Sequence, residues 1–180
     1  ESRTIFPLLA KPITRWQVLV GKFIGCWLAS GVALLVFYGF FALVSASRDH
    51  TLPVGAYVQA FWLHWQFLGI VLAMTLLGSV TFTAPSSNMT IIFIVTLGIW
   101  MMGGFLHLVA ERMTEPSASI LTAIYFMIPH LELFNMSELI IHDWPIPPWI
   151  DVLLLTLYGF LYTAFFLLAA CLVFRRKALN

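Results

Sequence analysis

Residues 22–44 read KFIGCWLASGVALLVFYGFFALV, and this stretch decides the fold. After Lys22 it contains no charged residue, and the next charge along the chain is Arg48. An apolar run of about 20 residues is long enough, as a helix, to cross the roughly 30 Å hydrocarbon layer of a bilayer. The sequence therefore predicts a transmembrane helix at this position.

Three more stretches have the same character, at about residues 59–82, 90–109 and 149–174. Hydrophobic residues make up 61% of the chain and charged residues 9%, whereas a soluble domain carries about 25% charge. Lipid-exposed backbone must satisfy its own hydrogen bonds, which favours helices. We therefore expect an all-α fold, a polytopic helical membrane protein with four spans and a transmembrane domain over residues 22–180. The sequence shows no basic groove pattern, so we expect no nucleic-acid partner.

Basic residues are concentrated at the two ends of the chain. Seven flank the first and fourth spans, against two, Arg48 and Arg112, in the loops on the other side. The positive-inside rule then places both ends in the cytoplasm. The seven are Arg3, Lys11, Arg15, Lys22, Arg175, Arg176 and Lys177. At the outer start of the second span we expect an aromatic belt in the membrane interface, formed by Tyr57, Phe61, Trp62 and Trp65.

The connection at about residues 110–148 is expected to be a structured outer loop. Its apolar run from Ile120 to Leu131 is too short to span and contains Pro129. Such a run is typical of a re-entrant or interfacial outer helix. Polar residues nearby could bind a metal only if they converge, and polar residues at the membrane interface are the commoner explanation. They are His107, Glu111, His130, Glu132, His142 and Asp143.

Residues 1–21 form a cytoplasmic segment ahead of the first span. Thr14 and Gln17 have the spacing of a capping box, and Pro12 disfavours helix at Lys11. A long helix is therefore expected to start at Arg15. On charge alone, the commoner role of such a segment is to anchor the chain on anionic lipid. The alternative is that it docks into the groove of a partner protein.

Small residues recur at four-residue spacing along the spans, which allows close helix packing. A first stripe consists of Gly21, Gly25, Ala29 and Ala33, and Gly69 with Ala73 forms a second. The pair at residues 103–104 predicts a kink or a tight contact in the third span.

The sequence contains no ATP-binding loop. Around Gly21-Lys22, such a loop requires Gly at position 16 and Ser or Thr at position 23, where this chain has Trp16 and Phe23. Between Lys22 and Glu111 the only charged residues lie in a predicted outer loop. Ion-coupled carriers keep charged groups at mid-depth, so this pattern disfavours them. We expect neither an enzyme nor a bound cofactor in this chain.

The opening segment resembles the cytoplasmic loop of ABC-2-type transporter permeases. That family shows Glu-x-x-Thr, a Leu-Leu pair, Pro-Val-Ser-Arg and then Gly-Lys before a span. The matching positions are Glu1, Thr4, Leu8, Leu9, Pro12, Ile13, Thr14, Arg15, Gly21 and Lys22. Residues 128–135 are similar to a stretch in the branch named for multicopper-enzyme maturation. The family has six spans, so the resemblance implies that the four here are the last four and that two precede Glu1. Pro7 departs from the pattern, which keeps a helix former there.

The resemblance implies a permease subunit of an ATP-binding cassette exporter in the bacterial inner membrane. It would pair with a second permease copy, identical or different, and dock ATPase subunits that hold ATP and Mg. Residues 1–10 would be the coupling helix that docks, and the cargo would pass between the two copies. The ATPase-docking residues implied are Arg3, Ile5, Phe6, Leu8, Leu9, Lys11 and Arg15.

Two alternatives remain. The first is a non-transport membrane scaffold that anchors a peripheral complex through the basic opening segment. The second is a multispan enzyme that uses the polar residues of the outer loop.

Overall fold

Four α-helices and one short 3₁₀ turn make up the regular structure of the described residues. The computed structural model describes residues 14–49, 54–110, 128–136 and 146–176, with single positions at 112, 117, 119 and 120. The elements are α2 (Arg15–Asp49), α3 (Val54–Thr81), α4 (Pro85–Ala110), η2 (Leu131–Phe134) and α7 (Trp149–Arg176). The predicted all-α class of a polytopic membrane protein is confirmed.

Three of these helices are long and apolar enough to cross a membrane: Arg15–Ser47, Val54–Thr81 and Trp149–Arg176. They contain the first, second and fourth expected spans almost entirely. The third expected span, about 90–109, lies within α4, whose described apolar part, Pro85–Met101, is shorter. Whether α4 also crosses stays a prediction.

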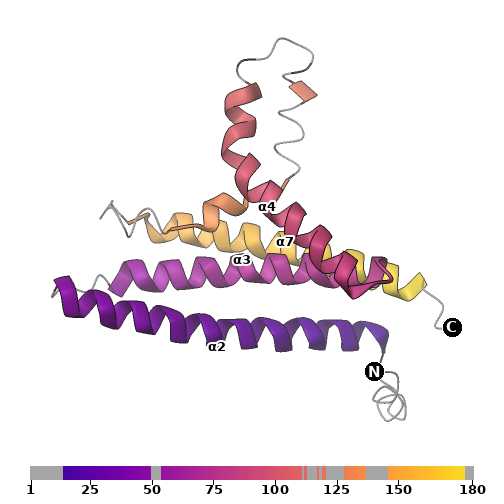
Figure 1. Ribbon diagram of the computed structural model, residues 1–180, viewed down its shortest axis with the longest axis horizontal. Helices are drawn as coiled ribbons and strands as arrows, with labels where there is room; N and C mark the ends of the chain where they lie inside the picture. Colours follow the sequence, from indigo (N-terminus) through magenta and orange to yellow (C-terminus); the bar gives the residue numbers. More distant parts are fainter. Residues whose placement is uncertain are drawn as a thin grey trace.

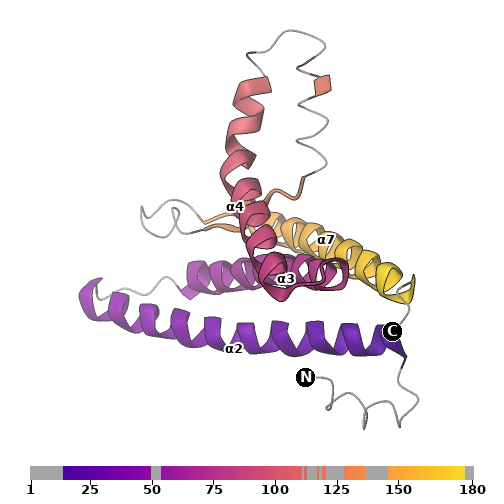
Figure 2. The same cartoon turned by 45° about the vertical axis from the view of Figure 1, so that its right-hand side comes forward.

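Helix α3 lies at the centre of the bundle. It packs against α7, α2 and α4, and its contact with α7 is the most extensive. Figures 1 and 2 show that α2 runs antiparallel to α3, whereas α7 runs parallel to it. In the same views α4 crosses the bundle and continues away from the other helices. The start of α2 and the end of α7 therefore lie at the same end of the bundle.

The first turn of α2 is fixed by its capping residues. The backbone N–H of Thr14 donates to Oε1 of Gln17 at 2.9 Å, and the N–H of Gln17 donates to the Thr14 carbonyl at 3.0 Å. The Gln17 side chain thus makes the bond that a capping box assigns to the third helical position. The predicted helix start at Arg15 is confirmed.

Two tryptophans join α2 to α3. The indole N–H of Trp27 donates to the Trp65 carbonyl at 3.1 Å, and that of Trp65 donates to the Trp27 carbonyl at 2.9 Å. Their rings stack, with centroids 4.5 Å apart and planes 18° apart. We call this reciprocal contact the tryptophan clasp. It gives both indole N–H groups a partner where lipid offers none.

A glycine opposite each indole makes room for the clasp. A Cβ at Gly31 would lie 2.6 Å from the Trp65 ring, and one at Gly69 would lie 3.0 Å from Nε1 of Trp27. Each helix therefore carries a Trp-x-x-x-Gly pattern, Trp27 with Gly31 and Trp65 with Gly69. The two patterns face each other across the antiparallel pair.

One expectation about packing is corrected. Gly21 and Gly25 have nothing within 4 Å of a Cβ position, and Ala29 and Ala33 are exposed. This stripe packs against no described part of the chain. The expected contact at Gly69 is confirmed. Trp65 bonds to α2, and its place in the expected aromatic belt stays a prediction.

Polar groups join α3 to α7 at the ends where the two helices begin. The Trp62 indole N–H donates to Oγ1 of Thr156 at 2.8 Å, and Nε2 of Gln59 donates to the Pro147 carbonyl at 3.3 Å. Trp62 therefore bonds within the bundle, and the expected aromatic belt stays a prediction.

The outer connection returns into the bundle at η2. Leu131 is 0% and Phe134 2% exposed, and the Phe134 ring stacks on Tyr158 of α7. Tyr158 is nine residues into α7, about 13 Å along its axis. Leu131 and Phe134 are thus buried among the helices, which fits the predicted re-entrant element, whereas Ile120, earlier in the connection, is 60% exposed. Residues 111, 113–116, 118, 121–127 and 137–145 lie outside the described part.

We predict that Gly31→Ala destabilises the protein while Gly25→Ala does not. The new methyl group at position 31 overlaps the Trp65 ring, at a cost of about 1–3 kcal/mol. At position 25 the space is open, and replacing a helical glycine stabilises by up to about 1 kcal/mol. Thermal unfolding in the same detergent measures both variants. Equal effects at the two positions would contradict the clasp.

Candidate functional site

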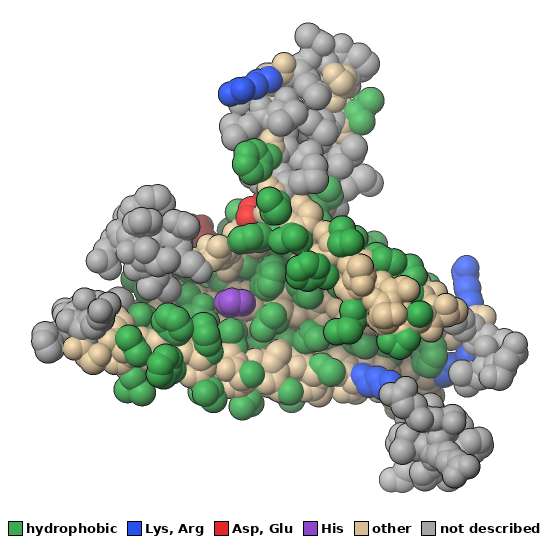
Figure 3. Space-filling model, viewed as in Figure 1, with side chains coloured by type: hydrophobic (Ala, Val, Ile, Leu, Met, Phe, Trp, Pro, Cys, Tyr) green, Lys and Arg blue, Asp and Glu red, His purple; other side chains and the backbone are tan. Residues whose placement is uncertain are grey.

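The end of the bundle that holds both described termini is basic. Arg15 and Lys22 lie on the first turns of α2, and Arg175 and Arg176 close α7. Figure 3 shows Lys and Arg side chains at this end, while hydrophobic side chains cover much of the surface between the ends. The described basic flanks of the first and last spans therefore lie at one end of the bundle, and their side of the membrane stays a prediction.

Arg15 links the start of α2 to the end of α7. Its Nη1 donates to the Phe174 carbonyl at 3.3 Å, and its guanidinium carbon lies 5.9 Å from the centroid of the Phe174 ring. The last carbonyls of a helix have no partner within the helix and carry partial negative charge. The guanidinium therefore caps α7 and also makes a cation–π contact.

A cavity of about 240 Å³ lies beside this contact, where three helices meet. Its walls come from α2, α3 and α7, and Lys22 is its one charged lining residue among those described. The lining residues are Val18, Leu19, Lys22, Leu76, Ser79, Val80 and Phe174. A segment entering from the basic end would thus meet all three helices.

Of the predicted docking residues, the described part of the chain includes Arg15. Arg3, Ile5, Phe6, Leu8, Leu9 and Lys11 lie outside it, so their role stays a prediction. The structure adds Phe174, which sequence reasoning missed. No local sequence pattern indicates it, because a contact between the start of α2 and the end of α7 depends on how the helices pack.

Side-chain contacts tie α2 to its neighbours at three levels. Arg15 contacts α7 at the basic end, the tryptophan clasp joins α3 near the middle, and Tyr38 lies 3.4 Å from Nδ1 of His64 of α3 towards the other end. The 35 residues of α2 make a helix about 52 Å long. Along this length α2 contacts both α3 and α7.

The proposed metal or enzyme site in the outer loop gains no support. No group of three or more His, Cys, Asp or Glu residues converges among the described residues. His130 forms contacts within the fold: its backbone N–H donates to the Tyr158 hydroxyl at 2.9 Å, and its ring Nδ1 lies 2.9 Å from the Ile128 carbonyl oxygen. The side chains of His107, Glu111, His142 and Asp143 lie outside the described part.

We predict that Arg15→Ala loosens the end of α7. Removal of the cap leaves the Phe174 carbonyl without its charged donor, a loss of about 1 kcal/mol. Amide hydrogen exchange in the last turn of α7 should then rise about fivefold. Lys22→Ala, which removes a cation at the same end of the bundle but on α2, is the control and should leave exchange in α7 unchanged. Equal exchange in wild type and Arg15→Ala would refute the cap.

A family model described as "ABC-2 family transporter protein" matches residues 1–179. No curated protein matches, and neither does a solved structure. The matched region includes the opening segment that carries the predicted docking residues.

Proposed function

We propose that this chain, which belongs to the ABC-2 transporter family, is the permease subunit of an exporter driven by a partner ATPase. The chain is a multi-pass membrane protein and a permease component of an ABC transporter. The coupling to ATP hydrolysis and the direction of transport are the proposal. Its main support is the continuity of α2, from the basic end to its contacts with both neighbouring helices.

Force from the ATPase would enter at residues 1–10. In the proposal, Ile5, Phe6, Leu8 and Leu9 fill a groove of the ATPase, and Arg3 and Lys11 pair with the rim of that groove. Closure of the ATPases around ATP then displaces the start of α2. Because Arg15 and the tryptophan clasp tie α2 to α7 and α3, the three helices would move together.

ATP and Mg are assigned to the partner subunit. This chain has Trp16 and Phe23 at positions where an ATP-binding loop needs Gly and Ser or Thr. Its part is therefore mechanical, with no residue acting on ATP. A second permease copy, identical or different, would complete the pathway for the cargo.

The proposed orientation has the basic end in the cytoplasm of a bacterium, with the helices in the inner membrane. The positive-inside rule supports it, since Arg15, Lys22, Arg175 and Arg176 share one end. Trp16, which is 55% exposed, lies at the same end, where an indole suits the membrane interface.

We predict that Phe6→Asp abolishes assembly with the ATPase. An aspartate in place of a buried Phe loses its apolar contact and adds an unpaired charge, so recovery of the ATPase should fall at least about tenfold. The tagged chain is solubilised from its native membrane, and the co-purified ATPase is identified by mass spectrometry and assayed for ATP hydrolysis. Ser2→Asp adds the same charge to the same segment and should leave recovery within about twofold.

Failure of the wild-type chain to recover any ATP-binding cassette subunit would defeat the proposal. Unchanged recovery of the ATPase by Phe6→Asp would defeat the docking role assigned to residues 1–10. Recovery of a different peripheral complex through residues 1–21 would instead support the membrane scaffold.

A further inference from the structure

A cavity of about 320 Å³ lies between α2, α3, α4 and η2, away from the basic end. Tyr38 is 11 residues before the end of α2, and His64 is 10 residues after the start of α3. At 1.5 Å per residue, both lie about 15 Å along the axis from the nearer helix end. The described residues that line the cavity are Tyr38, His64, Phe67, Trp100, Leu131, Phe134, Asn135 and Met136.

The aromatic walls of this cavity are held in place by other rings. Tyr38 meets Tyr57 and Phe61 edge to face, with centroids 6.5 and 6.1 Å apart. Phe134 packs on Gly159, where a Cβ would lie 3.2 Å from its ring. Such contacts fix the side chains before any ligand arrives. The cavity is therefore preformed, which is usual for small-molecule sites of this volume.

Three described lining side chains can form hydrogen bonds while carrying no charge: Tyr38, His64 and Asn135. The Tyr38 hydroxyl lies 3.4 Å from Nδ1 of His64, and no described residue bonds to Nε2 of that ring. When Tyr38 donates to Nδ1, the neutral imidazole carries its proton on Nε2. His64 then offers a donor to an acceptor oxygen of a ligand.

We propose that this cavity binds a small, uncharged and mainly apolar molecule that carries a carbonyl or hydroxyl oxygen. No Asp, Glu, Lys or Arg is among the described lining residues, so a charged group would be desolvated without a partner. Apolar and aromatic walls match the body of such a molecule, and Nε2 of His64 matches its oxygen. A ligand of this kind reaches a site at this depth through the lipid.

Binding at this site is independent of the proposed coupling to an ATPase. It is measured on the purified chain in lipid nanodiscs, without ATP or any partner. A negative result would therefore leave the permease proposal intact, and failure of ATPase docking would leave the cavity proposal intact.

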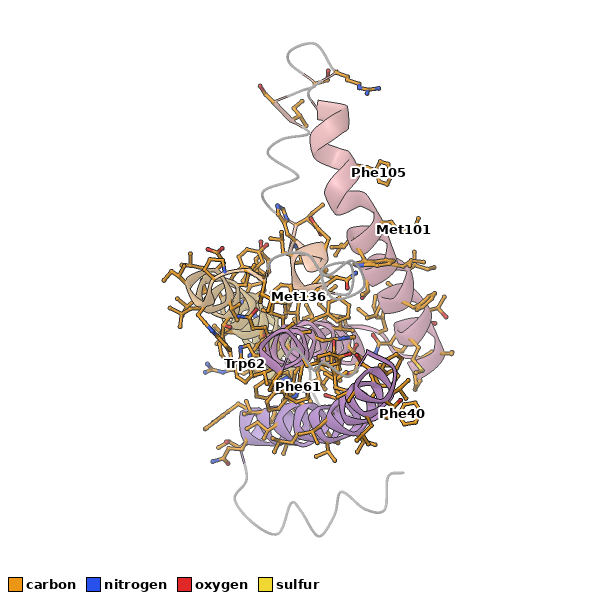
Figure 4. The ribbon with its side chains drawn as sticks, turned by 90° about the vertical axis from the view of Figure 1, so that its left-hand side faces the viewer. Phe40, Phe61, Trp62, Met101, Phe105 and Met136 are labelled. Atoms are coloured by element: carbon orange, nitrogen blue, oxygen red, sulfur yellow. The ribbon has the colours of Figure 1, made fainter. Side chains whose placement is uncertain are left out.

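Benzophenone is the probe, because it is uncharged and apolar, has one carbonyl and inserts into nearby C–H bonds on illumination. Two methionines provide a comparison inside one molecule. Met136 is 4% exposed and lines the cavity, whereas Met101 is 57% exposed on α4. Figure 4 shows Met136 beside α3, with Met101 and Phe105 along α4. Peptide mass spectrometry counts the adducts at each methionine as the probe concentration rises.

The proposal predicts saturable adducts at Met136 and adducts that rise linearly at Met101. In His64→Leu, the benzophenone concentration that gives half-saturation at Met136 should rise about fivefold to tenfold, since one hydrogen bond is lost. Phe40→Leu changes an aromatic residue on the outer face of α2, 64% exposed, and should leave half-saturation unchanged.

The proposal would be overturned on the wild-type chain alone if Met136 formed no adducts, or if its adducts rose linearly like those at Met101. Unchanged half-saturation in His64→Leu would overturn the assigned role of that ring.

Discussion

Two indole N–H groups connect α2 to α3 by donating to backbone carbonyls on the opposite helix. In water, burial of apolar surface would hold two such helices together, but lipid tails are as apolar as the side chains. Helix association in a bilayer therefore depends on close packing and on hydrogen bonds between helices. The clasp supplies both, because Gly31 and Gly69 let each indole reach the facing backbone. Most other arrangements described here follow from the position of α3, which the clasp fixes against α2.

The clasp is also one of the contacts on which the proposed coupling to a partner ATPase depends. Arg15 joins the basic end of α2 to α7, and Trp27 joins α2 to α3 about 18 Å further along the helix. Tyr38 and His64 continue the same contact towards the preformed cavity. The basic end and the cavity are thus connected through one continuous helix and its bonded neighbours.

Local patterns in the sequence predicted the local structure well. Thr14 and Gln17 placed the start of α2, and the apolar runs placed the helices, because capping and membrane length depend on nearby residues. Which side of each helix faces its neighbours was harder to predict, since these helices are apolar all round and hydropathy does not distinguish their faces. The stripe at Gly21 and Gly25 was misplaced for this reason.

For the candidate site, the sequence indicated the basic end and Arg15, and only packing revealed Phe174. The other predicted docking residues, such as Phe6, lie outside the described part of the chain, so their role stays a prediction. One signal was present but unused: the Trp-x-x-x-Gly pattern occurs in both the first and second spans.

The central claim is that the clasp makes α2 and α3 a single rigid unit. Electron–electron distance measurements between spin labels at Leu43→Cys and Val58→Cys, with Cys26 and Cys171 replaced by Ser and the ATPase bound, test it most directly. The account predicts the same distance, within about 2 Å, with and without ATP, whereas a distance that changes with ATP would contradict it.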